Sequence, residues 1–424
     1  LKVSSLANIT SNNASLFITY EQPFSESLNN ATQCSQIPAI LFDLDTLNSS
    51  YSFNGFAEIS FHSVSLQVKS RKALSVNFSS SSVSLRSCCL SNLSASSQGG
   101  NPKARTFNVI STSAALDNIF INGNANWITL AIASPQVVSL SNIVFTFPMD
   151  YSLVFDSNPA ISINGASKKN ASLTAQNFTL LGSMDSSNMS KLYPVLGAKS
   201  FTSVTVSNVS ITGQFFLQDA KGIFSIKNSS SLNLSTWNFY QYGLQADRLI
   251  PGQVSVISIE SVTNAALNDF TFSSVSLESY YSMGSVRIIH ISASSISNSL
   301  THLRITNFVF ANVSAFAPYD TLKIFELSTP DNSTNNPFMN FRVRNVTIRD
   351  QSKFENCEFF KYNPSYLFDM QIAIATTTLS MVPQRNHSFE SITIEDSQFI
   401  NSGVITLTSL HTPMTTPIVE PEKI

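Results

Sequence analysis

Residues 203–211 read Ser-Val-Thr-Val-Ser-Asn-Val-Ser-Ile, and this stretch carries the pattern that decides the fold. Apolar side chains lie four and two residues before Asn208, and then one and three residues after it. Because side chains of a straight strand alternate between its two faces, a straight strand cannot place all four on one face. A tight bend at the Asn can do so, and Asn tolerates the left-handed conformation that such a bend needs. The stretch therefore predicts a strand, a one-residue corner and a second strand.

The same pattern recurs along the chain at intervals of 24 to 46 residues, with a cluster near 31, which is the spacing of a repeat architecture. A further apolar segment precedes each corner, as residues 254–259 precede Asp269. No stretch of a dozen residues holds an apolar period of 3.6, so the chain is predicted to be all-β. The predicted corners are Asn118, Asn142, Asn177, Asn208, Asn238, Asp269, Asn307, Asn345 and Ser391.

Three strands and one Asn corner in each repeat resemble the coil of right-handed parallel β-helices of the pectin-lyase-like superfamily. The resemblance covers roughly residues 107–407. It implies a solenoid of about 12–13 coils of three short strands, formed by residues 1–411, with less regular coils over residues 1–106. It also implies that corner Asn side chains stack in the interior. The structural ladder is expected at Asn118, Asn142, Asn238 and Asn307.

The composition limits the possible partners. Charged residues make up 12% of the chain, against about 25% in an average protein, and the net charge is -2. No cluster of Lys and Arg could neutralise a nucleic acid backbone, and no apolar run approaches the ~18 residues of a membrane span. Neither nucleic acid binding nor a membrane span is therefore expected. Residues 412–424 are rich in Thr and Pro, which predicts a tail or linker.

Sixteen Asn-x-Ser/Thr sequons, together with a start at Leu1 instead of Met, predict a secreted, N-glycosylated protein at the cell surface or outside the cell. Three of them, at Asn177, Asn208 and Asn345, coincide with corners, and we expect these three to be unmodified because they would stack inside. The other sequons are predicted to carry N-glycans: Asn8, Asn13, Asn30, Asn48, Asn77, Asn92, Asn170, Asn188, Asn228, Asn233, Asn312, Asn332 and Asn386.

The four cysteines do not have the spacing of a zinc site. In an oxidising compartment a disulfide between Cys34 and either Cys88 or Cys89 is possible, while Cys357 is expected to be a buried thiol. No metal and no cofactor is predicted.

No catalytic motif is present, and no enzyme activity is predicted. His290, within the apolar run 288–291, is interpreted as a residue of the strand wall. Asp43 and Asp45 share one strand face, as a general acid and base would, but a solvated face or a calcium contact in a loop is the favoured interpretation.

The leading functional hypothesis is a structural protein, a subunit of a surface coat or filament. The open strand edges at both ends of a solenoid can pair with another chain, and no helix or charged loop that could cap them is found, so self-association end to end is predicted. One alternative is a β-helix that binds or cleaves carbohydrate, with a platform of Tyr240, Tyr242, Tyr280 and Tyr281. A second alternative is an adhesion or receptor ectodomain.

Overall fold

The computed structural model describes most of the chain, and all structural statements below concern these residues. The described residues are 2–3, 8–11, 14–20, 28, 31–44, 50–69, 74–92, 107–122, 130–133, 135–147, 159–165, 170–186, 188–192, 194–217, 221–246, 254–279, 286–292, 302–318, 322–328, 340–363, 370–375, 378–383 and 388–407. The predicted tail at residues 412–424 lies outside them.

The described chain is almost entirely β-structure, as predicted. Its one helix is the short α1 (Ala31–Cys34). The strands are β1 (Lys2–Val3), β2 (Asn8–Thr10), β3 (Ser15–Thr19), β4 (Ala39–Asp43), β5 (Tyr51–His62), β6 (Ser65–Lys69), β7 (Val76–Asn92), β8 (Phe107–Asn122), β9 (Leu130–Ala133), β10 (Val137–Thr146), β11 (Ile161–Asn164), β12 (Ser172–Leu181), β13 (Ser190–Leu192), β14 (Leu196–Lys199), β15 (Ser203–Leu217), β16 (Lys221–Ala246), β17 (Val254–Ser279), β18 (Val286–Ser292), β19 (His302–Phe316), β20 (Leu322–Ser328), β21 (Asn340–Arg349), β22 (Lys353–Glu355), β23 (Cys357–Asn363), β24 (Met370–Ala375), β25 (Thr378–Pro383), β26 (Ser388–Ile394), β27 (Gln398–Ile400) and β28 (Gly403–Leu407).

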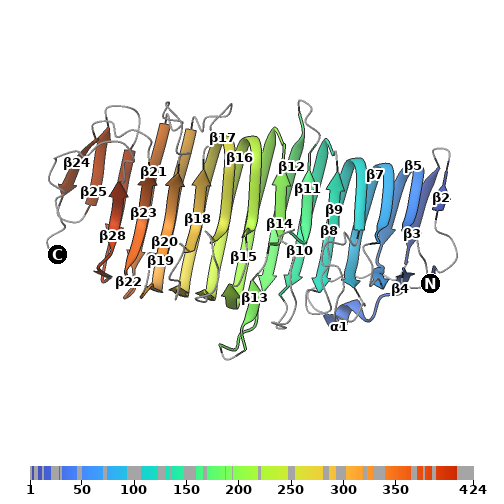
Figure 1. Cartoon of the computed structure of the whole chain (residues 1–424), viewed down its shortest axis with the longest axis horizontal. Coiled ribbons are helices and arrows are strands. Elements are labelled where there is room, and N and C mark those ends of the chain that lie inside the picture. The colour runs from blue at the N-terminus through green and yellow to red at the C-terminus, as the bar shows by residue number, and fades with distance from the viewer. Residues whose placement is uncertain are drawn as a thin grey trace.

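Strands separated by one sequence repeat lie side by side and run parallel (Figure 1). Val204 pairs in register with Leu173 of the preceding repeat, and Val209 pairs with Phe178. Apolar side chains therefore stack on apolar side chains from one repeat to the next. This register explains why the apolar pattern recurs at a spacing near 31 residues.

The predicted corners are real bends of the backbone. Asn208 has a φ of 54°, and the side chains of Val204, Val206, Val209 and Ile211 on both sides of it are buried. The bend thus resolves the change of phase in the apolar pattern. Aligned residues in successive repeats share this left-handed conformation: Ser63, Ser87, Asn118, Asn142, Asn177, Asn208, Thr236, Asp269, Asn307, Asn345 and Ser391.

One predicted corner is wrong. The bend in β16 occurs at Thr236, which has a φ of 58°, and not at Asn238. Trp237 and Phe239 on either side of Asn238 are both buried, so the strand alternates normally there. The prediction placed the corner at Asn238 because Asn occupies most other corners. The register with Asn208 and Asp269 places it two residues earlier.

The predicted fold class, a right-handed parallel β-helix of about 12–13 coils with three short strands each, is corrected by the strand pairing. The pairs β8–β10–β12–β15–β16–β14–β11–β9–β8 close on themselves, so these eight parallel strands form a closed barrel and the other strands lie outside it. The ring closes because β8 and β16 continue through their corners and pair on two faces. A residue at positive φ turns a strand without interrupting it, and β16 and β17 reach 26 residues each.

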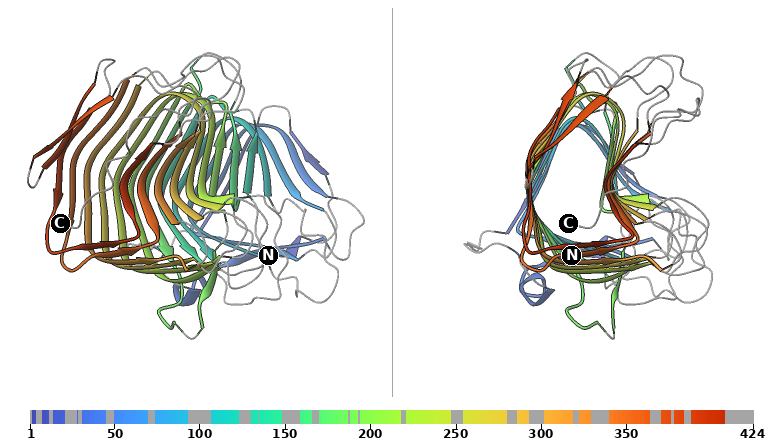
Figure 2. Two further views of the ribbon diagram at one scale, coloured as in Figure 1. Left: turned by 60° about the vertical axis from the view of Figure 1, so that its left-hand side comes forward. Right: turned by 90° about the vertical axis from the view of Figure 1, so that its left-hand side faces the viewer.

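Seen along the stack, the strands surround a common interior (Figure 2). The buried side chains form one hydrophobic core that extends from Ile40 to Ile392. Aromatic rings stack in register along it. Trp237 lies on Phe270 with ring centroids 5.4 Å apart, and Phe270 lies on Phe308 at 4.5 Å. A second, smaller cluster lies outside this core and includes Leu28, Ile37 and Phe120.

The two ends of the assembly differ. At the N-terminal end, β2 and β3 each pair only with β5 among the described residues. At the C-terminal end, β25 pairs antiparallel with β26 and β24 pairs antiparallel with β25. The expectation of an open strand edge at this end is therefore wrong for β26, whose outer edge is occupied by the antiparallel strand β25.

Candidate functional site

Hydrogen-bonded corner side chains form two ladders. Asn208 Nδ2 donates to Asn177 Oδ1 at 2.7 Å, Asn177 donates to Asn142 at 2.9 Å, and Asn142 donates to Asp117 Oδ1 at 2.9 Å. In the second ladder, Asn345 Nδ2 donates to Asn307 Oδ1 at 3.0 Å and Asn307 donates to Asp269 Oδ1 at 2.8 Å.

The ladders lie on the outside, which corrects the predicted interior ladder. Asn142 and Asn307 are exposed and Asn118 is half-buried, while Asn238 is exposed and is not a corner residue. At the bend the apolar side chains on both sides turn inward, so the corner side chain itself points outward. Asn142 and Asn307 do bond to side chains of both neighbouring repeats, as predicted, but Asn118 bonds to Ser87 and to the backbone of Leu28, and Asn238 belongs to neither ladder.

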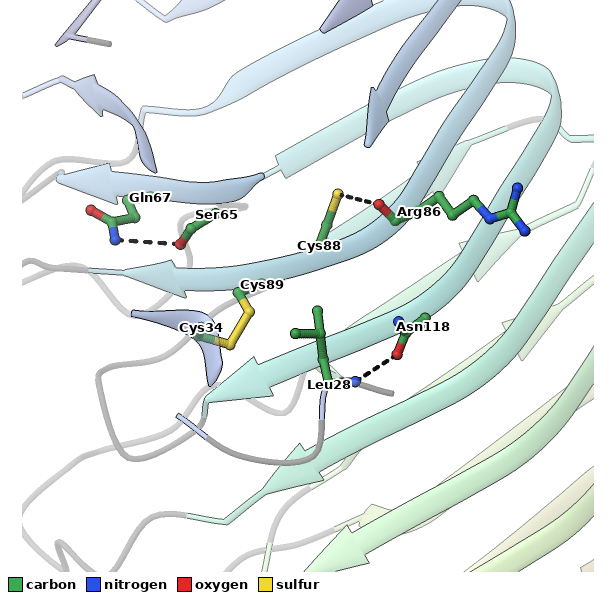
Figure 3. The surroundings of a disulfide bond; sticks show 8 residues. All are labelled: Leu28, Cys34, Ser65, Gln67, Arg86, Cys88, Cys89 and Asn118. Carbon is green, nitrogen blue, oxygen red and sulfur yellow. Dashed lines mark hydrogen bonds between the residues drawn. A yellow bond between two sulfur atoms is a disulfide. The ribbon is translucent and has the colours of Figure 1, made fainter. Parts of the chain in front are cut away.

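Asn118 joins the corner column to a segment far away in the sequence (Figure 3). It donates to Ser87 Oγ at 3.1 Å and accepts from the backbone N–H of Leu28 at 2.8 Å. Its carboxamide oxygen is therefore engaged by Leu28, and Asn142 donates to Asp117 instead. Residue 28 is buried in the outer apolar cluster beside Phe120.

The disulfide fastens the same segment to β7, which pairs with β8 of the barrel. Cys34 at the end of α1 is bonded to Cys89 of β7, with a Cα–Cα distance of 5.8 Å (Figure 3). Cys88 belongs to the main core instead, where burial raises the pKa of its thiol to about 12. Because neighbouring side chains of a strand point to opposite faces, only Cys89 reaches the outside. Cys357 is a buried free thiol, as expected.

The sequons that the structure describes fall into two groups. Asn170, Asn188 and Asn228 are exposed. In contrast, Asn77 Nδ2 donates to Ser52 Oγ at 3.3 Å, and Asn312 Nδ2 lies 3.5 Å from Ser274 Oγ. Asn233 accepts a hydrogen bond from Asn268. Asn13, Asn30, Asn48, Asn332 and Asn386 lie outside the described residues, as do the side chains of Asn8 and Asn92.

The three ambiguous sequons are exposed, so the reason given for leaving them unmodified is corrected. Asn177, Asn208 and Asn345 each donate a ladder hydrogen bond from Nδ2, the atom that would carry a glycan. A glycan on this nitrogen would replace one of its two N–H groups and would crowd the ladder contact. Their lack of modification stays a prediction, now based on hydrogen bonding instead of burial.

A buried group of charges lies on β18 and β20. The side chain of Glu326 is 3% exposed and contacts the guanidinium of Arg287, which is 5% exposed. Glu326 Oε1 also lies 3.2 Å from Lys323 Nζ. Arg287 and Lys323 pair in register on neighbouring strands, so one carboxylate contacts two adjacent cations. Burial is costly for charges unless they are paired, which makes Glu326 the residue that holds this group together.

His290 lies beside these charges, in register with Glu326. Its Nε2 is 2.9 Å from Ser328 Oγ. Burial, followed by the positive charge of Arg287, lowers the pKa of His290 to about 4. The imidazole is therefore neutral at pH 7 and belongs to the strand wall, in line with its interpretation from the sequence.

The charges around Glu326 were not predicted from the sequence. A signal was present, because Arg287, Lys323 and Glu358 occupy one register position in three successive strands. Isolated charges within otherwise apolar segments of aligned repeats could have indicated a buried ionic group.

The other candidates form no common site. Asp43 is buried, and Asp45 lies outside the described residues. Tyr242 is part of the core and packs on Phe215, so it cannot belong to an exposed sugar platform, whereas Tyr240 is 51% exposed. Tyr280 and Tyr281 lie outside the described residues.

Within the described part of the chain, no group of three His, Cys, Asp or Glu residues is placed to hold a metal ion. The described residues also include no helix of the length and hydrophobicity that a membrane span requires. Comparison with protein-family models, curated proteins and solved structures finds no match.

Proposed function

We propose that this chain is a structural, N-glycosylated extracellular protein that serves as a subunit of a surface coat or filament. The observation that carries the proposal is the unbroken core, which runs through the stacked strands from Ile40 to Ile392. Every repeat hydrogen-bonds to the next through backbone and, at many corners, through side chains. Such a stack of strands within one chain is a stiff, elongated support on which a surface layer can be built.

Two further observations favour an extracellular setting. The disulfide between Cys34 and Cys89 favours an oxidising compartment, because such bonds are rare where thiols are kept reduced. The sequons at Asn170, Asn188 and Asn228 are exposed, where a glycan can be attached. Glycans there would add solubility to a surface of few charges.

A glycan map of the protein secreted from a eukaryotic host tests this proposal. Peptide mass spectrometry should find sugar on Asn170, Asn188 and Asn228, and unmodified Asn at positions 177, 208 and 345. The same digest, prepared without reduction, should contain Cys34 linked to Cys89. A secreted chain with no glycan at Asn170, Asn188 and Asn228, or with reduced Cys34 and Cys89, would contradict an extracellular structural glycoprotein.

A further inference from the structure

The N-terminal end of the assembly presents an uncharged strand edge. β3 has the sequence Ser-Leu-Phe-Ile-Thr and pairs only with β5 among the described residues. The side chain of Phe17 is 60% exposed, and that of Tyr20, just beyond the strand, is 37% exposed. Exposed edges of natural sheets usually carry a charge or a proline that prevents pairing, and β3 carries neither.

The core is also incompletely covered at this end. Leu16 and Ile18 point inward and pack against the main core, yet both are only partly buried. They have neighbours of β5 on one side and none on the other among the described residues. A second strand laid against β3 would cover both side chains and satisfy its free backbone groups.

We propose that β3 pairs antiparallel with β3 of a second copy of this chain, across a two-fold axis through Phe17. The strand is five residues long, so this register places Phe17 opposite its counterpart and Leu16 opposite Ile18 of the second copy. The inward residues of both copies then form one apolar row. Antiparallel pairing of a strand with itself is an isologous contact, which closes as a dimer.

The C-terminal end favours this partner over an unlike end. β26 follows β21 in the column of parallel strands that begins with β3 and β5. Its outer edge is occupied by β25, so it offers no free edge to β3 of another molecule. The contact rests on the proposed structural function only for its biological purpose: it joins two subunits and closes, so a coat or filament would grow from this dimer through other contacts.

Cysteine cross-linking of the full chain tests the register. Directly opposed residues of antiparallel strands have Cα atoms ~4.5–5.5 Å apart, within the range of a disulfide. Phe17→Cys should form a covalent dimer under mild oxidation, whereas Tyr240→Cys, exposed in the middle of the stack, should not. Ser15→Cys alone should stay monomeric on a non-reducing gel, but should link to Thr19→Cys when the two variants are mixed.

Sedimentation of Phe17→Lys provides the second measurement. Two lysines opposite each other should weaken dimerisation at least tenfold, about 1.4 kcal/mol, while the circular dichroism spectrum stays unchanged. A wild-type monomer at high concentration would overturn the proposal. The proposal would also be overturned if sedimentation shows polymers while Phe17→Cys forms no covalent dimer. That result would favour head-to-tail contacts through β24. Neither result depends on the glycan map.

Discussion

The corner ladders make the stability of the fold sensitive to single exposed residues, and Asn307 is the position where this is best tested. Its side chain makes two ladder hydrogen bonds, to Asp269 and from Asn345, and its φ is 58°. Two exposed hydrogen bonds contribute about 0.5 kcal/mol each, at the low end of the usual range. An alanine forced into the left-handed region costs about 1 kcal/mol more. Asn307→Ala should therefore lower the free energy of unfolding by about 2 kcal/mol, and Asn307→Gly by about 1 kcal/mol.

Thr236 supplies the matched opposite change. It occupies the same corner column with a φ of 58°, a conformation that a β-branched residue adopts only under strain. Thr236→Asn relieves this strain and places an amide between Asn208 and Asp269, so it should raise the free energy of unfolding by about 1 kcal/mol.

Equilibrium urea unfolding followed by circular dichroism, on unglycosylated protein, measures all three variants. Neither substituted position is part of a sequon, so glycosylation does not complicate the comparison. The reasoning is refuted if Asn307→Ala and Asn307→Gly match the wild type within error, or if Thr236→Asn is destabilising.

Three further changes have definite expected outcomes. Cys34→Ser removes a disulfide that joins residues 55 apart in the sequence, and urea unfolding should show a loss of up to about 4 kcal/mol in the free energy of unfolding. The buried thiols of Cys88 and Cys357 should stay reduced. Glu326→Gln removes the carboxylate that contacts both Arg287 and Lys323 and should lower the free energy of unfolding by about 3–5 kcal/mol, whereas Glu260→Gln, whose side chain is 44% exposed, should change it by under about 0.5 kcal/mol. The pKa of His290 is about 4 in the folded protein and near 6.5 when unfolded. The contribution of the neutral imidazole to the free energy of unfolding is therefore complete above pH 6.5 and is lost as the pH falls towards 4. Urea unfolding at pH 7 and at pH 4.5 should show this loss, about 2–3 kcal/mol, in the wild type and not in His290→Asn.

The β-class, the parallel register and most corners follow from the sequence by itself. Each corner is a local event, because the phase of the apolar residues around Asn208 or Asn307 leaves a left-handed bend as the only way to bury them all. The interval between such patterns then sets which strands can stack. Asn238 marks the limit of this reasoning, since the bend at Thr236 depends on the repeats above and below it.

Other features were decided only by the tertiary structure, because they depend on where segments distant in sequence lie around the barrel. The phase of the apolar alternation predicts that the chain bends at each corner. The packing of the flanking side chains decides that Asn142 and Asn307 point outward. Cys88 and Cys89 are adjacent in sequence, and only the face that each occupies selects Cys89 as the partner of Cys34. Arg287 and Glu326 meet because neighbouring strands bring them together. Local conformational preferences are encoded residue by residue, whereas contacts between faces exist only once the strands have stacked.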